Sequence, residues 1–306
     1  MSNLEFVASC DGIRIYRFNV DYFSLFNSPY YAHAYEGALD AYLLGDKHVF
    51  YCLTPGQVVG VRRIKAAALR RFPHSEFDYV ILIRSEENPS LIVRVLHVKP
   101  FVEEGDQLNV GDLVGEPLRS GFFDPWTSLH AHIEVKYPDY VFRAKGFLPI
   151  VLNINGEVKG GREEENVFLE VIDINDTYIL AYVDDRCTAS FGRVKGLGVK
   201  VGERFGILDC GLPYYRRGGV ILAGGESIGA GGNVMLGGTV IGWVCGFARN
   251  GVKIVVRDVS LECEGLPLKG ISAFLSLSEK AMVKLVPYKN TTVKFGEGDL
   301  VQLKVA

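Results

Sequence analysis

The sequence has no long uninterrupted apolar run and no excess of charge of one sign. Its 306 residues carry a formal net charge of -3 and a pI ≈ 6.1, which gives no general attraction to nucleic acid or to an anionic membrane. No run of apolar residues is long enough to span a bilayer, and the N-terminal segment lacks a charged region followed by an apolar one. We therefore expect a cytoplasmic protein that binds neither nucleic acid nor membrane.

Several chemical motifs are also missing. The six cysteines contain no CxxC pair, so neither a four-thiolate zinc site nor a secreted disulfide framework is supported. The GxxxxGK motif of P-loops does not occur. The chemistry of this chain must therefore come from another group of residues.

Short runs rich in Val, Ile, Tyr and Phe, bounded by Gly, Asp, Asn or Pro, predict a mainly β protein. The expected strands cover residues 49–53, 58–62, 79–84, 91–97, 130–135, 167–172, 178–183, 252–256 and 301–305. One helix is expected at Ile64 to Phe72, because Lys, Ala, Leu and Arg are strong helix formers and Pro73 ends the run.

A change in composition near residue 148 predicts two domains, 1–148 and 149–306. All six histidines lie in the first, whereas the second has fourteen glycines between Gly206 and Gly251. Gly105-Asp106 in the first half and Gly202-Glu203 in the second each separate apolar residues. Such corners are typical of strands that turn sharply in a compact barrel or sandwich. We expect a barrel-sandwich fold in the first domain and a glycine-rich β fold in the second.

Two histidines alternate within a strand pattern, Leu129-His130-Ala131-His132-Ile133. The side-chain period of a strand is two, so His130 and His132 project from one face and their apolar neighbours from the other. Neutral imidazole is a common metal ligand and a general base. One ring of the pair could therefore bind a metal while the other transfers protons.

The wider pattern around this pair follows a known order. His97 ends a predicted strand, the turns Gly105-Asp106 and Gly111-Asp112 follow, and the HxH strand comes next. This order and spacing resemble the lysostaphin-type zinc metallopeptidase family, and uncharacterised lysostaphin-like proteins of archaea in particular. The resemblance spans roughly residues 28 to 135. It implies a β-sandwich with a duplicated hybrid motif, in which His132 is a zinc ligand and His130 and His97 are catalytic.

The family's remaining ligands form an HxxxD element, and here that position reads Glu36-Gly37-Ala38-Leu39-Asp40. Glutamate can bind zinc through oxygen, so the expected metal ligands are Glu36, Asp40 and His132. This oxygen-rich set would also suit Mn²⁺ or Fe²⁺. His33 is the alternative first ligand, but its odd spacing from Asp40 places it on the opposite face of a regular strand.

Two functions remain open. Glutamate in place of the first histidine favours a degenerate peptidase-like domain that binds a peptide or small molecule without turnover. The alternative is a metal-dependent hydrolase of amide bonds, in which His130 takes a proton and His97 stabilises an oxyanion. The second domain shows no recognisable site, and its apolar content indicates a surface for homo-oligomer formation.

Overall fold

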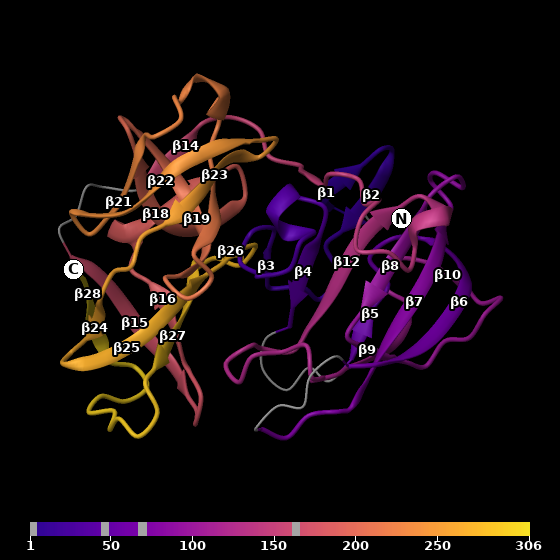
Figure 1. The fold of residues 1–306 in the computed structure, drawn as a ribbon, viewed down its shortest axis with the longest axis horizontal. Coiled ribbons are helices and arrows are strands. Elements are labelled where there is room, and N and C mark those ends of the chain that lie inside the picture. Colours follow the sequence, from indigo (N-terminus) through magenta and orange to yellow (C-terminus); the bar gives the residue numbers. More distant parts are fainter. Residues whose placement is uncertain (1–4, 44–48, 67–71, 161–165) are drawn as a thin grey trace. The chain divides into compact units, whose positions relative to one another are not determined.

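The computed structural model describes residues 5–43, 49–66, 72–160 and 166–306. Strands make up nearly all of its regular structure, which confirms the mainly β prediction (Figure 1). The helical segments of the described ranges are short 3-10 turns: η1 (His33–Tyr35), η2 (Pro138–Tyr140), η3 (Asp185–Cys187) and η4 (Gly225–Ser227). No helix in those ranges is long and apolar enough to cross a membrane.

Contacts divide the chain into two compact units. The first contains residues 1–23 and 35–153, and the second contains residues 24–34 and 154–306. Each unit has its own set of antiparallel strands.

The first unit is built on one antiparallel sheet in the order β4-β12-β8-β7-β6-β10. Its strands are β4 (Leu39–Tyr42), β12 (His130–Lys136), β8 (Ile92–Leu96), β7 (Phe77–Ser85), β6 (Gly56–Lys65) and β10 (Gln107–Leu108). β12 lies between β4 and β8, and His132 is opposite Asp40 on one side and Leu96 on the other. This register brings the HxH pair beside a residue from the start of the chain.

Shorter strands complete the first unit. β5 (Phe50–Tyr51), β11 (Leu113–Pro117) and β9 (Val98–Pro100) form one small sheet, and β2 (Ile13–Tyr16), β1 (Phe6–Cys10) and β13 (Val151–Leu152) form another. β3 (Tyr22–Ser24) and the 3-10 turn η1 stand at the two ends of residues 24–34, which are grouped with the second unit. A buried apolar core that includes Phe50, Ile81 and Ile133 holds these strands together.

The predicted helix at 64–72 is wrong where the structure describes it. Ile64 and Lys65 continue strand β6 and pair with Asp78 and Phe77 of β7. Pairing along the whole hairpin outweighs the helix propensity of a few Lys and Ala residues, which is a weak preference. Residues 67–71 of the predicted helix lie outside the described ranges.

The second unit contains two closed rings of antiparallel strands. The first ring runs β15-β16-β27-β25-β24-β28 and returns to β15. The second runs β18-β19-β20-β23-β22-β21 and returns to β18. A closed ring leaves no unpaired strand edge, and its inward side chains fill the barrel. The rings share one large buried apolar cluster.

The strand bounds of this unit follow. They are β14 (Val158–Gly160), β15 (Val167–Ile174), β16 (Ile179–Val183), β17 (Thr188–Phe191), β18 (Val194–Val201), β19 (Arg204–Leu212), β20 (Arg217–Ile221), β21 (Asn233–Leu236), β22 (Thr239–Ala248), β23 (Gly251–Val256), β24 (Leu261–Cys263), β25 (Leu266–Ala273), β26 (Leu275–Ser276), β27 (Met282–Pro287) and β28 (Leu300–Val305).

Candidate functional site

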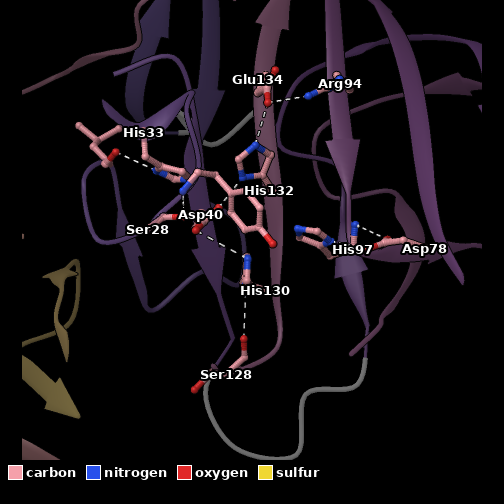
Figure 2. Close-up of polar contacts among 12 residues, drawn as sticks. Ser28, His33, Asp40, Asp78, Arg94, His97, Ser128, His130, His132 and Glu134 are labelled. Atoms are coloured by element: carbon pink, nitrogen blue, oxygen red, sulfur yellow. Dashed lines mark hydrogen bonds and ion pairs between the residues drawn. The ribbon is translucent and has the colours of Figure 1, made fainter. Parts of the chain in front are cut away.

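One face of strand β12 carries four polar side chains in alternation: His130, His132, Glu134 and Lys136. All four are buried. Polar groups are buried at a cost unless they are hydrogen-bonded or paired, so a whole polar face inside a sheet indicates a built site. Figure 2 shows the rings and carboxylates that surround the first three of them.

His132 lies between two carboxylates. Its Nδ1 is 2.7 Å from Asp40 Oδ1, and its Nε2 is 2.9 Å from Glu134 Oε1. Burial alone would lower the pKa of His132, but the hydrogen bonds to Asp40 and Glu134 outweigh it and raise the pKa to about 9. Two carboxylates on one ring require a positive charge at that ring, supplied by a proton or by a cation.

His33 joins Asp40 and His132. One ligand atom from each of the three side chains lies within 4.8 Å of the other two, and all three residues are buried. Nδ1 of His33 donates to the carbonyl of Leu25 at 2.8 Å, since a carbonyl only accepts. Nε2 is then the nitrogen that carries the lone pair in the neutral ring. Two imidazoles and one carboxylate match the three protein ligands of catalytic zinc sites, so the donor set fits such an ion.

This group contains His33 rather than the expected Glu36. The spacing argument against His33 assumed a regular strand from residue 33 to residue 40. The chain instead forms the 3-10 turn η1 and enters β4 only at Leu39, so alternation does not apply. Glu36 has φ 56°, and its carbonyl accepts from the Ile150 amide at 2.7 Å. Three residues join η1 to β4, and the chain itself therefore keeps His33 near Asp40.

His130 is oriented by its own strand. Its Nδ1 donates to the carbonyl of Ser128 at 2.9 Å, and its Nε2 is 3.7 Å from Asp40 Oδ2. The ring stacks on Phe123 with centroids 4.8 Å apart. Burial lowers the pKa of His130 to about 4, because it outweighs the attraction of the Asp40 carboxylate. His130 is therefore neutral near pH 7, with its lone pair on Nε2.

His97 reaches the same place from the end of β8 (Figure 2). Its ring centroid is 5.2 Å from that of His130 and 5.9 Å from that of His132. The predicted grouping of His97 with the HxH pair is thus present in the structure. His97 has φ 66°, a left-handed conformation that is uncommon for residues with a side chain and is held only where its surroundings stabilise it.

Asp78 supplies that stabilisation. Its Oδ2 accepts from His97 Nδ1 and from Ser120 Oγ, each at 2.6 Å. Its Oδ1 accepts from the amides of His97 and Tyr79 at 3.0 and 2.7 Å. Burial would raise the pKa of Asp78, but the positive charge of His97 and these hydrogen bonds lower it. Asp78 thus fixes both the backbone and the ring of His97.

Two family models match the chain. The Domain of unknown function (DUF8155) N-terminal domain matches residues 15–152, and the Domain of unknown function (DUF8155) C-terminal domain matches residues 165–306. The chain belongs to this family. No curated protein and no solved structure matches it. The four histidines of the candidate site lie within the N-terminal match.

Sequence reasoning missed three residues around this candidate site. Glu134 and Lys136 continue the alternation of the HxH pair, so the period of the strand could have placed them on its polar face. Asp78 has no such signal. The pairing of β7 with β8 brings it beside His97, and a single sequence does not reveal which strands pair.

The second unit offers no comparable group among the residues described. Tyr214 and Tyr215 of the Tyr-Tyr-Arg-Arg segment contact each other edge to face, with centroids 4.6 Å apart. The Tyr214 hydroxyl forms a hydrogen bond with Ser272 Oγ. The arginines of this segment follow directly, with Arg216 at φ 55°. Packing and turn formation account for the two tyrosines.

Proposed function

We propose that this protein is a metal-dependent hydrolase that cleaves an amide bond in a peptide or small molecule. The observation that carries the proposal is the convergence of His33, Asp40 and His132 with two further imidazoles, His97 and His130. Three donors with additional acid-base groups beside them are the composition of a catalytic metal site rather than a structural one.

Zinc is the ion that the donor set suits best, because two of the three donors are imidazole nitrogens. A divalent ion held by His33 Nε2, His132 Nδ1 and an Asp40 oxygen would supply Lewis-acid chemistry there. With His33 rather than Glu36 as a ligand, the set has one carboxylate instead of two. It therefore leaves more of the ion's positive charge uncompensated than the oxygen-rich set predicted from sequence.

His130 is suited to accept a proton. Its Nδ1 hydrogen is committed to Ser128, and its low pKa keeps the ring neutral with the lone pair on Nε2. That atom lies toward Asp40 and hence toward the proposed ion. General-base catalysis by a positioned histidine of this kind contributes about 10²–10⁴-fold to a rate.

His97 is suited to hold positive charge opposite His130. The Asp78 carboxylate on Nδ1 orients the ring and would stabilise a positive charge on it. Nε2 then donates a hydrogen bond, which would stabilise an oxyanion in the transition state. The two histidines thus have different roles because their Nδ1 partners differ, a carbonyl for one and a carboxylate for the other.

A binding module without turnover is the second candidate. The side chains of the site are almost completely buried, with His97, His130 and His132 at 5%, 5% and 6% exposure. Such burial leaves little surface for a large substrate to reach the rings. It favours either a small ligand or a site that binds without reaction.

Metal content measured in matched variants tests the proposal. We expect about one zinc per chain in the purified wild type, and a clear loss in His33→Ala and His132→Ala. His74→Ala and Glu36→Gln should retain it. His74 is the control because it lies in the first unit outside the metal-binding group, with its Nδ1 on the Phe72 carbonyl. Wild type without stoichiometric metal, or a His132→Ala variant that keeps it, contradicts the proposed site.

Hydrolysis separates the two candidates. Zinc-loaded wild type is incubated with a pool of short fluorogenic peptides and acylated amino acids, beside His130→Ala and His74→Ala. Turnover that His130→Ala loses while keeping its zinc supports the hydrolase. Binding of a peptide without turnover, equal in wild type and His130→Ala, supports the binding module.

A further inference from the structure

A buried ion network lies against His132 on the side of its Nε2 atom. Oε1 of Glu134 is 2.9 Å from that nitrogen and 2.7 Å from Nη2 of Arg94, while Oε2 is 2.9 Å from Nζ of Lys136. Glu134 is 2% exposed and Lys136 is 0% exposed. Acidic and basic side chains of this kind are almost never fully buried unless they are paired.

Each cation that holds Glu134 has a second anchor. Arg94 donates from Nη1 to the carbonyl of Val141 at 2.9 Å, and Lys136 donates to the carbonyl of Arg143 at 2.7 Å. Both carbonyls lie in the segment after β12. The Glu134 carboxylate is therefore held by groups that are themselves fixed. Its Oε1 stays beside His132 and Arg94, and its Oε2 stays beside Lys136.

This arrangement decides which nitrogen of His132 carries a proton. A carboxylate held by two cations only accepts hydrogen bonds, so Nε2 of His132 keeps its proton when the ring gives up the other one. Nδ1, on the Asp40 side, then carries the lone pair when the ring is neutral. A ligating histidine whose other nitrogen donates to a carboxylate has its orientation fixed and its basicity raised.

We propose that Glu134, clamped by Arg94 and Lys136, is a positioning residue that makes Nδ1 of His132 the metal-binding atom. This inference rests on the metal site of the proposed function and deepens it, because it assigns the ligating atom and the residue that selects it. Glu134 does not touch the ion or a substrate in this assignment. It acts only through His132.

Zinc affinity measured by competition with a chromophoric chelator tests the assignment. Glu134→Gln is nearly isosteric and removes the charge. We expect it to weaken zinc binding about 10- to 100-fold, the usual loss when a carboxylate behind a ligating histidine is removed. The matched control is Glu87→Gln, because Glu87 also accepts from an arginine and from a second side chain in this unit, Arg14 and Tyr16, away from the site.

A charge-balanced variant separates positioning from simple disruption. Glu134→Gln leaves Arg94 and Lys136 without an anion between them, and it could fail to fold for that reason. The double variant Glu134→Gln, Lys136→Met removes one negative and one positive charge together. Compared with Lys136→Met alone, the double variant should still show the 10- to 100-fold loss. If the double variant bound zinc as tightly as Lys136→Met does, the proposal would be overturned.

The imidazole nitrogens of His132 give a readout that needs no variant. In the zinc-loaded full chain, ¹⁵N NMR of the side chain should show a proton on Nε2 and the metal on Nδ1. Ligation through Nε2 would overturn the assignment, as would a Glu134→Gln affinity equal to that of wild type. Wild type that binds no zinc would overturn the proposed function as well, whereas tight binding unaffected by Glu134→Gln would overturn only this inference.

Discussion

His132 and His130 differ in charge because different groups face the nitrogens of their rings. His132 faces two carboxylates, which raise its pKa to about 9, whereas burial lowers the pKa of His130 to about 4. The strands place these rings on one face two residues apart. Two histidines on one strand thus differ in charge because their surroundings differ. The difference between their pKa values can be measured.

Acid should destabilise the metal-free protein through His130. Its folded-state pKa is about 4 and its reference value is 6.5. Because the folded value is the lower one, the stability due to the neutral ring is fully present above pH 6.5 and is lost as the pH falls toward 4. The difference between the two values corresponds to roughly 3 kcal/mol.

Urea unfolding of chelator-treated protein at several pH values measures this loss. Between pH 7 and pH 4 the wild type and His74→Gln should lose roughly 3 kcal/mol more than His130→Gln. His74→Gln controls for the removal of a histidine from the same unit. Parallel pH profiles for all three proteins would show that His130 is not buried in its neutral form.

At the scale of elements, the strands were predictable because β-branched and aromatic runs with regular turns specify them locally. The strands expected at 58–62, 79–84, 91–97 and 130–135 correspond to β6, β7, β8 and β12. The expected helix at 64–72 was wrong at Ile64 and Lys65 because the hairpin of β6 and β7 extends through them. Local propensity does not show how far a partner strand continues.

Two glycines of strand β22 should differ in how much stability the same substitution costs. A Cβ added at Gly242 would lie 2.2 Å from the backbone oxygen of Val255, whereas one added at Gly246 would meet nothing within 4 Å. The Val255 oxygen belongs to the paired strand β23 and does not move without disturbing the ladder. Gly242→Ala should therefore cost about 2 kcal/mol, and Gly246→Ala less than about 0.5 kcal/mol.

Thermal denaturation of the two alanine variants, followed by circular dichroism, checks this expectation. The variants share a strand, a residue type and a substitution, so differences in intrinsic propensity cancel. Equal melting temperatures would mean that β22 and β23 are not packed as closely at Gly242 as the structure shows.

At the scale of the whole molecule, the two compact units account for the contrast in composition between the two halves. The first unit carries Asp40, His97, His130 and His132 of the candidate site, and the glycine-rich second unit forms the two closed rings. All six cysteines are unpaired with one another, and Cys245 is exposed whereas the other five are buried. This distribution gives a simple probe of whether both units are folded.

One thiol should react quickly with Ellman's reagent in the native protein, and six should react after unfolding in guanidinium. Cys245→Ser should abolish the fast reaction and leave five thiols in the denatured protein. Burial keeps the remaining thiols from the reagent and raises the pKa of Cys52 to about 11 and of Cys263 to about 12. Rapid reaction of more than one native thiol would show that a core is open to solvent.

The sequence by itself determined the mainly β fold, the contrast between its halves, and the HxH pair on one strand face. These features depend on residues close together in the chain, where the period of a strand places side chains. Only the tertiary structure decided that His33 rather than Glu36 joins Asp40 and His132, and that Asp78 supports His97. Those contacts depend on where η1 turns and on which strands pair, and both are set by packing across the whole sheet.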